Sequence, residues 1–330
     1  MSSMAQLMTL VFVLVSMLYA TSAGAQSVPA AFPVKPITVV HPQATGGPVD
    51  ITTRLVAQKA GEYMGRSVLV EARPGAGGTI SAMYVKQANP DGYTLLLGNH
   101  VSLAVNVTLM PNLPYDPLKH FVPVTLLWNN PTLMTVSASS PARNLRELIA
   151  IAQQAPDKVS YATAGIGTTG HLAGHMLAAA VRSTMVHVPY KGSVEAIGDL
   201  MSGRVDTYIG SYASVATYHK AGKIRLLAAV SEKRNAIAPD VPTIVELGYP
   251  GIHFDGWFGI LAPAGTAQAV VQRLQSEFVK AVTSPEVHAK LASQGTVTMT
   301  SASPAEFGTF IAGEIIRLGR AAKLSGATAD

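Results

Sequence analysis

A glycine-rich segment with phosphate-binding spacing is the clearest chemical motif of this sequence. Residues 165–170 (GIGTTG) match the pattern G-x-G-x-x-G between an expected strand and an expected helix. In dinucleotide-binding proteins this pattern places a pyrophosphate at the helix N-terminus. Here the next strand ends in His187-Val188-Pro189-Tyr190 and supplies no acidic residue for a ribose. We therefore interpret the loop as a general anion site, formed by backbone N–H groups and a helix dipole.

Two histidines on the expected helix after this loop have a spacing that can bind zinc. His171 and His175 lie four residues apart, but Leu172 stands where a zincin has its glutamate. No obvious third ligand follows, although His187 could lie nearby. Cysteine is absent, which removes thiolate catalysis and Cys-based metal sites. The sequence also lacks a G-x-S-x-G elbow. We interpret the two histidines as a polar helix face and predict no metal, cofactor or catalytic residue.

Glycine-rich turns between a strand and a helix occur three times, at residues 43–50, 74–80 and 165–171. Each turn offers backbone donors at the carboxyl end of a strand, where open α/β sheets bind ligands. Hydroxyl groups are added by Thr45, Thr79, Thr168 and Thr169. One such turn would indicate only a change of chain direction. Three of them, divided between two halves, favour an anion-binding cleft between domains.

Alternating strand and helix patterns predict an α/β fold for the elements that carry these turns. In the first half, strands are expected at 37–40, 68–71 and 93–97, with helices from Pro48 to about Met64 and from the second turn to about Ala88. Pro48 suits the first turn of its helix, and Gly65 suits the end. A stretch rich in proline, 111–131, separates this half from the next units.

The second half repeats the alternation. Its expected strands are 159–162, 185–188, 207–209 and 225–230, and its expected helices begin near Thr169 and cover 193–201. A strand at 257–262 then returns toward the first half. Helices follow at 267–282 and from Pro304, where Ser303 and Glu306 have the spacing of a capping box.

The composition is that of a folded protein with room for two domains. Of its 330 residues, 48% are apolar and 13% are charged, which is too apolar for a disordered chain. The net charge of +5 is spread along the chain without a basic block, so a nucleic-acid partner is disfavoured.

The N-terminal residues have the pattern of a secretory signal peptide. Residues 7–20 form an apolar run, shorter than the roughly 20 residues of a membrane span, and Ala23-Gly24-Ala25 is a small-x-small cleavage site. The segment before the run has no Lys or Arg, which leaves a buried N-terminal helix as the alternative. We predict a signal peptide over 1–25, cleaved after Ala25, and an exported protein of residues 26–330 without a lipid anchor.

The sequence resembles the Bug-type (TctC-like) extracytoplasmic solute receptors of tripartite tricarboxylate transporters. Prominent matching segments are RPGAGG at 73–78, PDGYTLLLG at 90–98 and HVPYKGS at 187–193. Further matches lie at 35–38, 46–50, 113–117, 167–174, 203–206, 221–223, 239–243 and 257–266. They occur in the order of the family and cover nearly all of residues 33–330.

The resemblance implies a two-domain periplasmic-binding-protein fold of type II (Venus flytrap), with mostly parallel sheets flanked by helices and a cleft between the domains. Domain 1 would be discontinuous, formed by 26–127 plus 252–330, and domain 2 would be formed by 128–251. Both crossings agree with the stretch rich in proline and with the returning strand.

The resemblance also implies a set of ligand-binding residues. The residues carried over from the family's loops are Ala44, Thr45, Gly46, Gly47, Gly75, Ala76, Gly77, Gly78, Gly167, Thr168, Thr169, His171 and Asp206. Gln43 and Thr45 depart from the family's usual Pro-Phe-Ala-Ala-Gly-Gly loop. The Asn99-His100 pair replaces a run of small residues, and His175 stands where Glu is common. We predict that Gln43, Asn99 and His100 tune the ligand.

The function that the resemblance implies is capture of a small carboxylate in the periplasm and its transient delivery to membrane transporter subunits. The protein would be a monomer, not an enzyme, and would need no cofactor. Two alternatives stay open: a sensory receptor that presents its ligand to a membrane kinase, and a periplasmic enzyme. The ligand is left open among di- and tricarboxylates, acidic amino acids and aromatic carboxylates.

Overall fold

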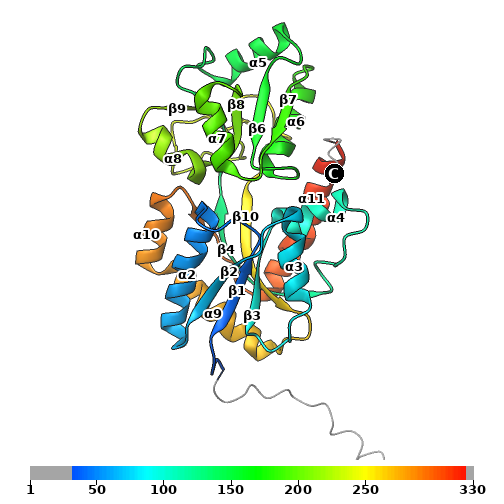
Figure 1. Cartoon of the computed structure of the whole chain (residues 1–330), viewed down its shortest axis with the longest axis vertical. Coiled ribbons are helices and arrows are strands. Elements are labelled where there is room, and N and C mark those ends of the chain that lie inside the picture. The colour runs from blue at the N-terminus through cyan, green and yellow to red at the C-terminus, as the bar shows by residue number, and fades with distance from the viewer. Residues whose placement is uncertain (1–31, 325–330) are drawn as a thin grey trace, which may run out of the picture. The chain divides into compact units, whose positions relative to one another are not determined.

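The computed structural model describes residues 32–324 (Figure 1). Residues from Pro33 onward form one compact unit. The predicted signal peptide, 1–25, and its cleavage site lie outside the described residues. None of the helices within 32–324 has the length and apolar character needed to cross a membrane.

One sheet has six strands in the order β11-β4-β10-β3-β1-β2. Its strands are β1 (Ile37–His41), β2 (Val68–Ala72), β3 (Thr94–Asn99), β4 (Phe121–Asn130), β10 (Gly256–Pro263) and β11 (Val297–Thr298). The helices α2 (Pro48–Met64), α9 (Gln268–Thr283) and α10 (Pro285–Ser293) lie on one side of the sheet. The helices α3 (Thr79–Lys86), α4 (Asn106–Leu109) and α11 (Pro304–Leu324) lie on the other (Figure 1).

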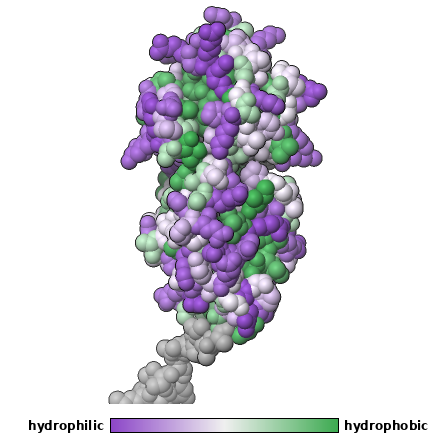
Figure 2. Space-filling view, turned by 90° about the vertical axis from the view of Figure 1, so that its left-hand side faces the viewer, coloured by the Kyte–Doolittle hydropathy of each residue, from purple (hydrophilic) through white to green (hydrophobic). Residues whose placement is uncertain are grey.

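The second sheet has five strands in the order β7-β6-β8-β5-β9. These strands are β5 (Thr132–Ser137), β6 (Ser160–Thr163), β7 (Val186–Pro189), β8 (Thr207–Ser211) and β9 (Ile224–Ala229). The helices that accompany them are α5 (Leu145–Gln154), α6 (Thr169–Ala180), α7 (Ser193–Ser202) and α8 (Tyr212–Lys220). In Figure 2 hydrophilic and hydrophobic residues are interspersed over the visible face of the molecule.

The predicted α/β architecture with helix-flanked sheets is confirmed, but the expectation of mostly parallel sheets needs a correction. The pairs β1–β2, β1–β3, β6–β7 and β6–β8 are parallel. By contrast, β10 runs antiparallel to β3 and β4, and β5 runs antiparallel to β8 and β9. The reason is the route of the chain: β5 and β10 enter their sheets from the edge where the other sheet lies, opposite in direction to their neighbours.

The stretch rich in proline is not a mere separator, because it contains β4. Pro123 pairs with Leu261 of β10 at a point where the register shifts. Proline is tolerated inside a sheet at such irregularities, since a bulge leaves one ladder position without a hydrogen bond. The indole of Trp128 in the same strand stacks on Phe258 of β10, with ring centroids 5.5 Å apart.

Helix ends with strong sequence signals form as predicted. The helix α2 begins at Pro48, and Gly65 closes it with a positive φ of 66°. At the start of α11, the Glu306 N–H donates to Ser303 Oγ, and the Ala302 N–H donates to the Glu306 carboxylate. Local capping therefore fixes where these helices begin.

Candidate functional site

A cavity of about 290 Å³ lies where loops from both sheets meet. It is lined by Gln43, Ala44, Gly47, Pro48, Val49, Asn99, His100, Val101, Asn130, Thr132, Ala164, Thr168, Thr169, Gly170, Lys191, Gly192, Ser193, Val194, Glu195, Tyr208, Ile209, Gly210, Ser211, Ser214, Gly256 and Phe258. The carboxyl ends of β1, β3, β6 and β8 lead into these loops. The cavity is thus at the strand ends where α/β sheets bind ligands.

The four helices α2, α6, α7 and α8 all begin at this cavity. Their N-cap residues are Gly47, Thr168, Gly192 and Ser211, and every one of them contributes to the lining. The first backbone N–H groups of a helix have no partner inside the helix and carry partial positive charge. Four helix N-termini around one cavity therefore create a strong preference for an anionic group.

Seven of the predicted ligand residues line the cavity together. They are Gln43, Ala44, Gly47, Asn99, His100, Thr168 and Thr169. The other nine lie outside the lining. They are Thr45, Gly46, Gly75, Ala76, Gly77, Gly78, Gly167, His171 and Asp206.

The glycine-rich loop after β2 lies behind the cavity wall. A Cβ at Gly78 would lie 2.9 Å from the Cβ of Ser102 and 3.1 Å from that of Pro42, and Gly78 also has a positive φ of 90°. The amide of Asn106 donates to the Gly77 carbonyl at 3.1 Å. This loop therefore supports the segments that follow β1 and β3, because only glycine fits so close to them.

His171 and Asp206 have structural partners away from the cavity. The Gly167 N–H donates to His171 Nδ1 at 3.1 Å, so the imidazole fixes the loop before α6. Asp206 directly precedes β8, at the opposite end from Ser211, and its carboxylate accepts from the N–H and the hydroxyl of Ser160, both at 2.8 Å. It therefore joins the beginnings of β6 and β8.

Asp50 shapes the loop after β1 from within the first turn of α2. Its buried carboxylate accepts from His41 Nε2 at 2.9 Å, from the Gly46 N–H at 2.9 Å and from Arg54 Nε at 3.0 Å. Burial alone would raise the pKa of Asp50, but the hydrogen bonds from Arg54, Gly46 and His41 outweigh it and lower the pKa below its usual range. The loop that carries Gln43 is thereby held at the cavity.

His100 is the most unusual lining residue. It is 7% exposed, and within residues 32–324 neither ring nitrogen has a hydrogen-bond partner of good geometry. Its ring meets that of Phe258 edge to face, with centroids 6.5 Å apart. Burial lowers the pKa of His100 to about 4, and the smaller raising effects of Glu314 and the Trp257 backbone do not reverse this. His100 is therefore neutral at pH 7.

A chain of hydrogen bonds connects the site to the strands that cross between the sheets. The carboxylate of Asp255, next to β10, accepts from the Thr132 N–H at 3.2 Å, and the hydroxyls of Thr132 and Thr169 lie 2.8 Å apart. Burial raises the pKa of Asp255 to about 6. The crossing segments and the N-terminus of α6 are thus in direct contact.

The histidines near α6 pack as a stack. The rings of His171 and His187 are 4.1 Å apart between centroids and nearly parallel, whereas His175 is exposed. His187 Nε2 lies 2.8 Å from Thr163 Oγ1. In the part of the chain that the structure describes, no three metal-binding side chains are grouped to hold an ion.

Several lining residues were not predicted from the sequence. Asn130, Gly256 and Phe258 come from strands that reach the cavity from distant parts of the chain. Lining residues 191–195 comprise the end of the loop before α7 and the first turn of that helix, and 191–193 lie in a segment that resembles the family, which was a usable signal. No local spacing marks Ser211, whose place follows from how β8 and β6 pair.

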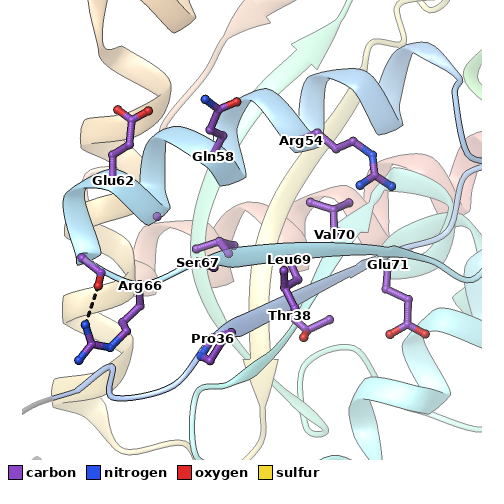
Figure 3. Close-up of a pocket in the computed structure, with 13 residues that line it drawn as sticks. Pro36, Thr38, Arg54, Gln58, Glu62, Arg66, Ser67, Leu69, Val70 and Glu71 are labelled. Carbon is purple, nitrogen blue, oxygen red and sulfur yellow. Dashed lines mark hydrogen bonds between the residues drawn. The ribbon is translucent and has the colours of Figure 1, made fainter.

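A larger hollow of about 1020 Å³ lies elsewhere, along β2 and α2 (Figure 3). It is an open surface groove bordered by Arg54, Gln58, Glu62, Arg66 and Leu69. None of the predicted ligand residues lies in it. The smaller cavity is the better candidate because helix N-termini and the buried His100 meet there.

Two sheets on either side of a cavity, with helix N-termini directed into it, define a solute-binding protein of the periplasmic-binding-protein fold. The sequence model of the family described as "Tripartite tricarboxylate transporter family receptor" matches residues 52–326. The chain belongs to this family. Its members are periplasmic solute receptors rather than enzymes.

Named relatives cover nearly the whole chain. BugT of Bordetella pertussis is 33% identical over 97% of this chain and 98% of its own length. The structure of Rpa4515 of R. palustris with adipate has a TM-score of 0.84 and 32% identity, covering 90% of this chain and 99% of that one. MatC (Rpa3494) from Rhodopseudomonas palustris with bound malate has a TM-score of 0.80 and 30% identity, covering 88% and 100%.

Proposed function

We propose that this chain binds a small carboxylate in the 290 Å³ cavity and delivers it to a tripartite tricarboxylate transporter. The observation that carries the proposal is the meeting of four helix N-termini at one cavity in a member of this receptor family. The acids named for the two neighbouring structures, adipate and malate, support a carboxylate ligand. No bond is made or broken.

The carboxylate binds at the N-terminus of α6. The first turn of α2 contains Asp50 and that of α7 contains Glu195, whereas the fully described first turn of α6 contains no acidic residue. The first turn of α8 also contains no acidic residue, so the partial charges of α6 and α8 are the least compensated of the four. Between these two we assign the carboxylate to α6, because its start lies in the segment 167–174 that matches the family. Thr169 adds a hydroxyl there, whereas the hydroxyl of Thr168 already donates to the Gly165 carbonyl at 2.8 Å. Gln43, Asn99 and His100 contact the ligand from the other wall.

Ligand binding closes the cavity by bringing two domains together. We assign residues 26–127 plus 252–330 to one domain and 128–251 to the other. The segments that join β4 to β5 and β9 to β10 act as the hinge, because they are the crossings between the sheets. A ligand that contacts both walls shifts this equilibrium toward the closed form.

The mature receptor is an exported monomer, and its contact with the membrane subunits is transient. One ligand in one closing cavity requires no second copy of the chain. The signal peptide over residues 1–25 directs export, and the mature chain begins at Gln26.

A ligand screen tests this function. Residues 26–330 are purified and heated with a panel of carboxylates, and hits are followed by calorimetry. An acid present at about 100 times its Kd stabilises the folded protein by about 2.7 kcal/mol and raises the Tm by several degrees. We expect at least one acid to bind without being consumed. Turnover of the acid, or a Tm unchanged by every acid, contradicts the proposal.

A further inference from the structure

The two walls of the cavity differ in charge. The lining residues from the six-stranded sheet and its loops include the amides Gln43, Asn99 and Asn130 and the imidazole of His100, and among these described residues none is a carboxylate, Lys or Arg. The opposite wall carries Lys191 and Glu195, whose charges oppose each other. The N-terminus of α2 also lies on the first wall, where the carboxylate of Asp50 offsets its partial charge. The cavity thus has a polar wall without net charge and an opposite wall where the N-terminus of α6 attracts an anion.

His100 gives the neutral wall its specific chemistry. In the described chain both of its ring nitrogens are buried without a hydrogen-bond partner of good geometry, although the Trp257 backbone lies close enough to raise the pKa of the ring, and His100 lines the cavity beside Gly256 and Phe258. A neutral imidazole offers one N–H donor and one acceptor nitrogen, so it pairs fully with a group that can both accept and donate. A hydroxyl or a primary amide is such a group, whereas a carboxylate only accepts.

The charged groups around His100 do not favour an anion beside it. Glu314 and Arg317 of α11 act on the imidazole with opposite signs, and their side chains already form an ion pair with an N–O distance of 2.7 Å. The indole N–H of Trp257 also donates to Glu314 at 2.8 Å. Asp255, one residue before Gly256, is engaged with the Thr132 N–H. A second carboxylate at His100 would therefore be buried without a cation of its own.

From this asymmetry we propose that the ligand carries a single negative charge, with its carboxylate at the N-terminus of α6 and an uncharged hydroxyl or amide group hydrogen-bonded to His100. The inference rests on the proposed function and names the class of acid. His100 is the specificity-determining residue. At about 290 Å³ the cavity suits a compact molecule, on the order of ten non-hydrogen atoms.

The test compares acids that differ in charge but hardly in shape. Succinate, glutarate and adipate are each paired with their monoamide, in which one carboxylate is replaced by a primary amide. Calorimetry on the wild-type chain measures the Kd of each compound. At the chain length that binds, we expect the monoamide to bind at least tenfold more tightly than the diacid. A buried hydrogen-bonding site discriminates by this much or more when its partner is wrong.

A matched pair of variants assigns the discrimination to His100. His100→Leu removes both ring nitrogens at similar volume, and we expect the monoamide to lose about tenfold in affinity while the diacid changes little. His175→Leu makes the same replacement at an exposed position on α6 outside the cavity and should leave both Kd values unchanged. Circular dichroism checks that His100→Leu folds. The wild-type comparison stands even where that variant does not fold.

The number of protons taken up or released on binding gives a further test of the charge of the ligand. Binding of the monoamide should release or take up almost no proton between pH 5 and 8, as measured by calorimetry in two buffers of different ionisation enthalpy. If the diacid binds as tightly as the monoamide, or more tightly, without uptake of a proton, the inference is wrong and the proposed carboxylate receptor stands. If no acid of either kind binds, the proposed function itself fails.

Discussion

At the scale of single residues, a buried charged side chain determines the position of a loop at the site. The carboxylate of Asp50 is held by His41, Gly46 and Arg54 and in turn holds the loop that follows β1. His41 Nδ1 accepts from the Gln43 N–H at 3.3 Å, so its Nε2 carries the proton donated to Asp50. Gln43 is therefore positioned through two residues that never touch the cavity.

Replacing Asp50 by Asn should weaken both folding and binding. The amide keeps the shape but cannot accept three hydrogen bonds as a charged group, so we expect the free energy of unfolding in urea to fall by about 2–4 kcal/mol. Asp240→Asn is the control, because Asp240 is exposed and no hydrogen bond of its side chain is found within the described residues. The control should change stability by less than about 0.5 kcal/mol. Equal losses would show that Asp50 has no special role.

The stacked histidines make the protein sensitive to acid. Burial, together with repulsion from His171, lowers the pKa of His187 to about 3. A histidine whose folded pKa lies below its unfolded value of about 6.5 binds protons more readily in the unfolded state. Its contribution to stability is therefore complete above pH 6.5 and is lost as the pH falls.

His187→Phe keeps an aromatic ring in the stack and removes this titration. Between pH 7 and pH 5 the wild-type chain should lose about 2 kcal/mol more unfolding free energy than the variant does. Urea denaturation at the two pH values measures the difference. At pH 7 the variant loses the bond to Thr163, about 1 kcal/mol. An identical pH dependence of the two proteins would contradict the assignment.

At the scale of elements, the position of α6 depends on close contact with β8. A Cβ on Gly170, in the first turn of α6, would collide with the backbone carbonyl of Ile209. This glycine lets the helix N-terminus approach the strand and places Thr168 and Thr169 at the cavity. The geometry of the site therefore depends on the absence of a side chain at Gly170 as well as on the side chains of Thr168 and Thr169.

Two Gly→Ala variants in helices should have opposite effects. Alanine favours a helix by about 1 kcal/mol over glycine, so Gly198→Ala in α7, where no described atom lies within 4 Å of the new Cβ, should stabilise the protein. Gly170→Ala should instead destabilise it by about 1–3 kcal/mol, because the strand must move. Thermal unfolding measures both. Stabilisation by both substitutions would mean that α6 is free to shift.

Elements with local end signals could be predicted from the sequence, and those set by tertiary contacts could not. The helix over 48–64 has its proline and glycine at the ends and is found there, and α6 begins at the expected Thr169. The strands β4 and β5 were missed, because proline in β4 suggested a linker and the pairing partner β10 lies far along the chain. The helices α5, α8 and α10 were also not predicted.

The site residues likewise divide into those marked by local sequence signals, which could be predicted, and those placed by tertiary contacts, which could not. The loops after β1 and before α6 were found because glycine-rich turns follow strands in the sequence, and Asn99 and His100 after β3 were found because they depart from the pattern of the family. The lining by Gly256, Phe258 and Ser211 follows from strand order, which leaves no local pattern. Asp206 lies at the far end of β8 from the cavity, since a motif position does not reveal which end of a strand faces the ligand.

At the scale of the whole molecule, the crossings between the sheets are in contact with the site. The backbone N–H of Thr132 donates to the Asp255 carboxylate, and the hydroxyl of Thr132 is hydrogen-bonded to that of Thr169. We therefore expect a movement of the crossing segments to reach the N-terminus of α6. Binding and closure should depend on the same hydroxyl.

Thr132→Val should lower the affinity for the ligand more than it lowers stability. Loss of the Thr132–Thr169 hydrogen bond should raise the Kd by about two- to tenfold, corresponding to about 0.5–1.5 kcal/mol. Small-angle scattering should also show a smaller decrease in the radius of gyration when ligand is added. Thr135→Val is the control, because Thr135 is buried in the same strand, does not line the cavity, and donates its hydroxyl to the backbone carbonyl of Tyr208 rather than to α6. Equal effects of the two variants on the Kd would contradict the coupling.

The position of β10 between β3 and β4 determines which of the two sheets is completed last when the chain is synthesised. β10 joins the pair β11–β4 to the group β3-β1-β2, yet it follows every strand of the other sheet in the sequence. A chain that emerges N-terminus first can complete β7-β6-β8-β5-β9 while β3 and β4 still have unpaired edges. Such edges can pair with other chains. The six-stranded sheet, whose first strands are synthesised first, is therefore the last to be completed. A nascent chain that stops before Gly256 should be the aggregation-prone form of this protein.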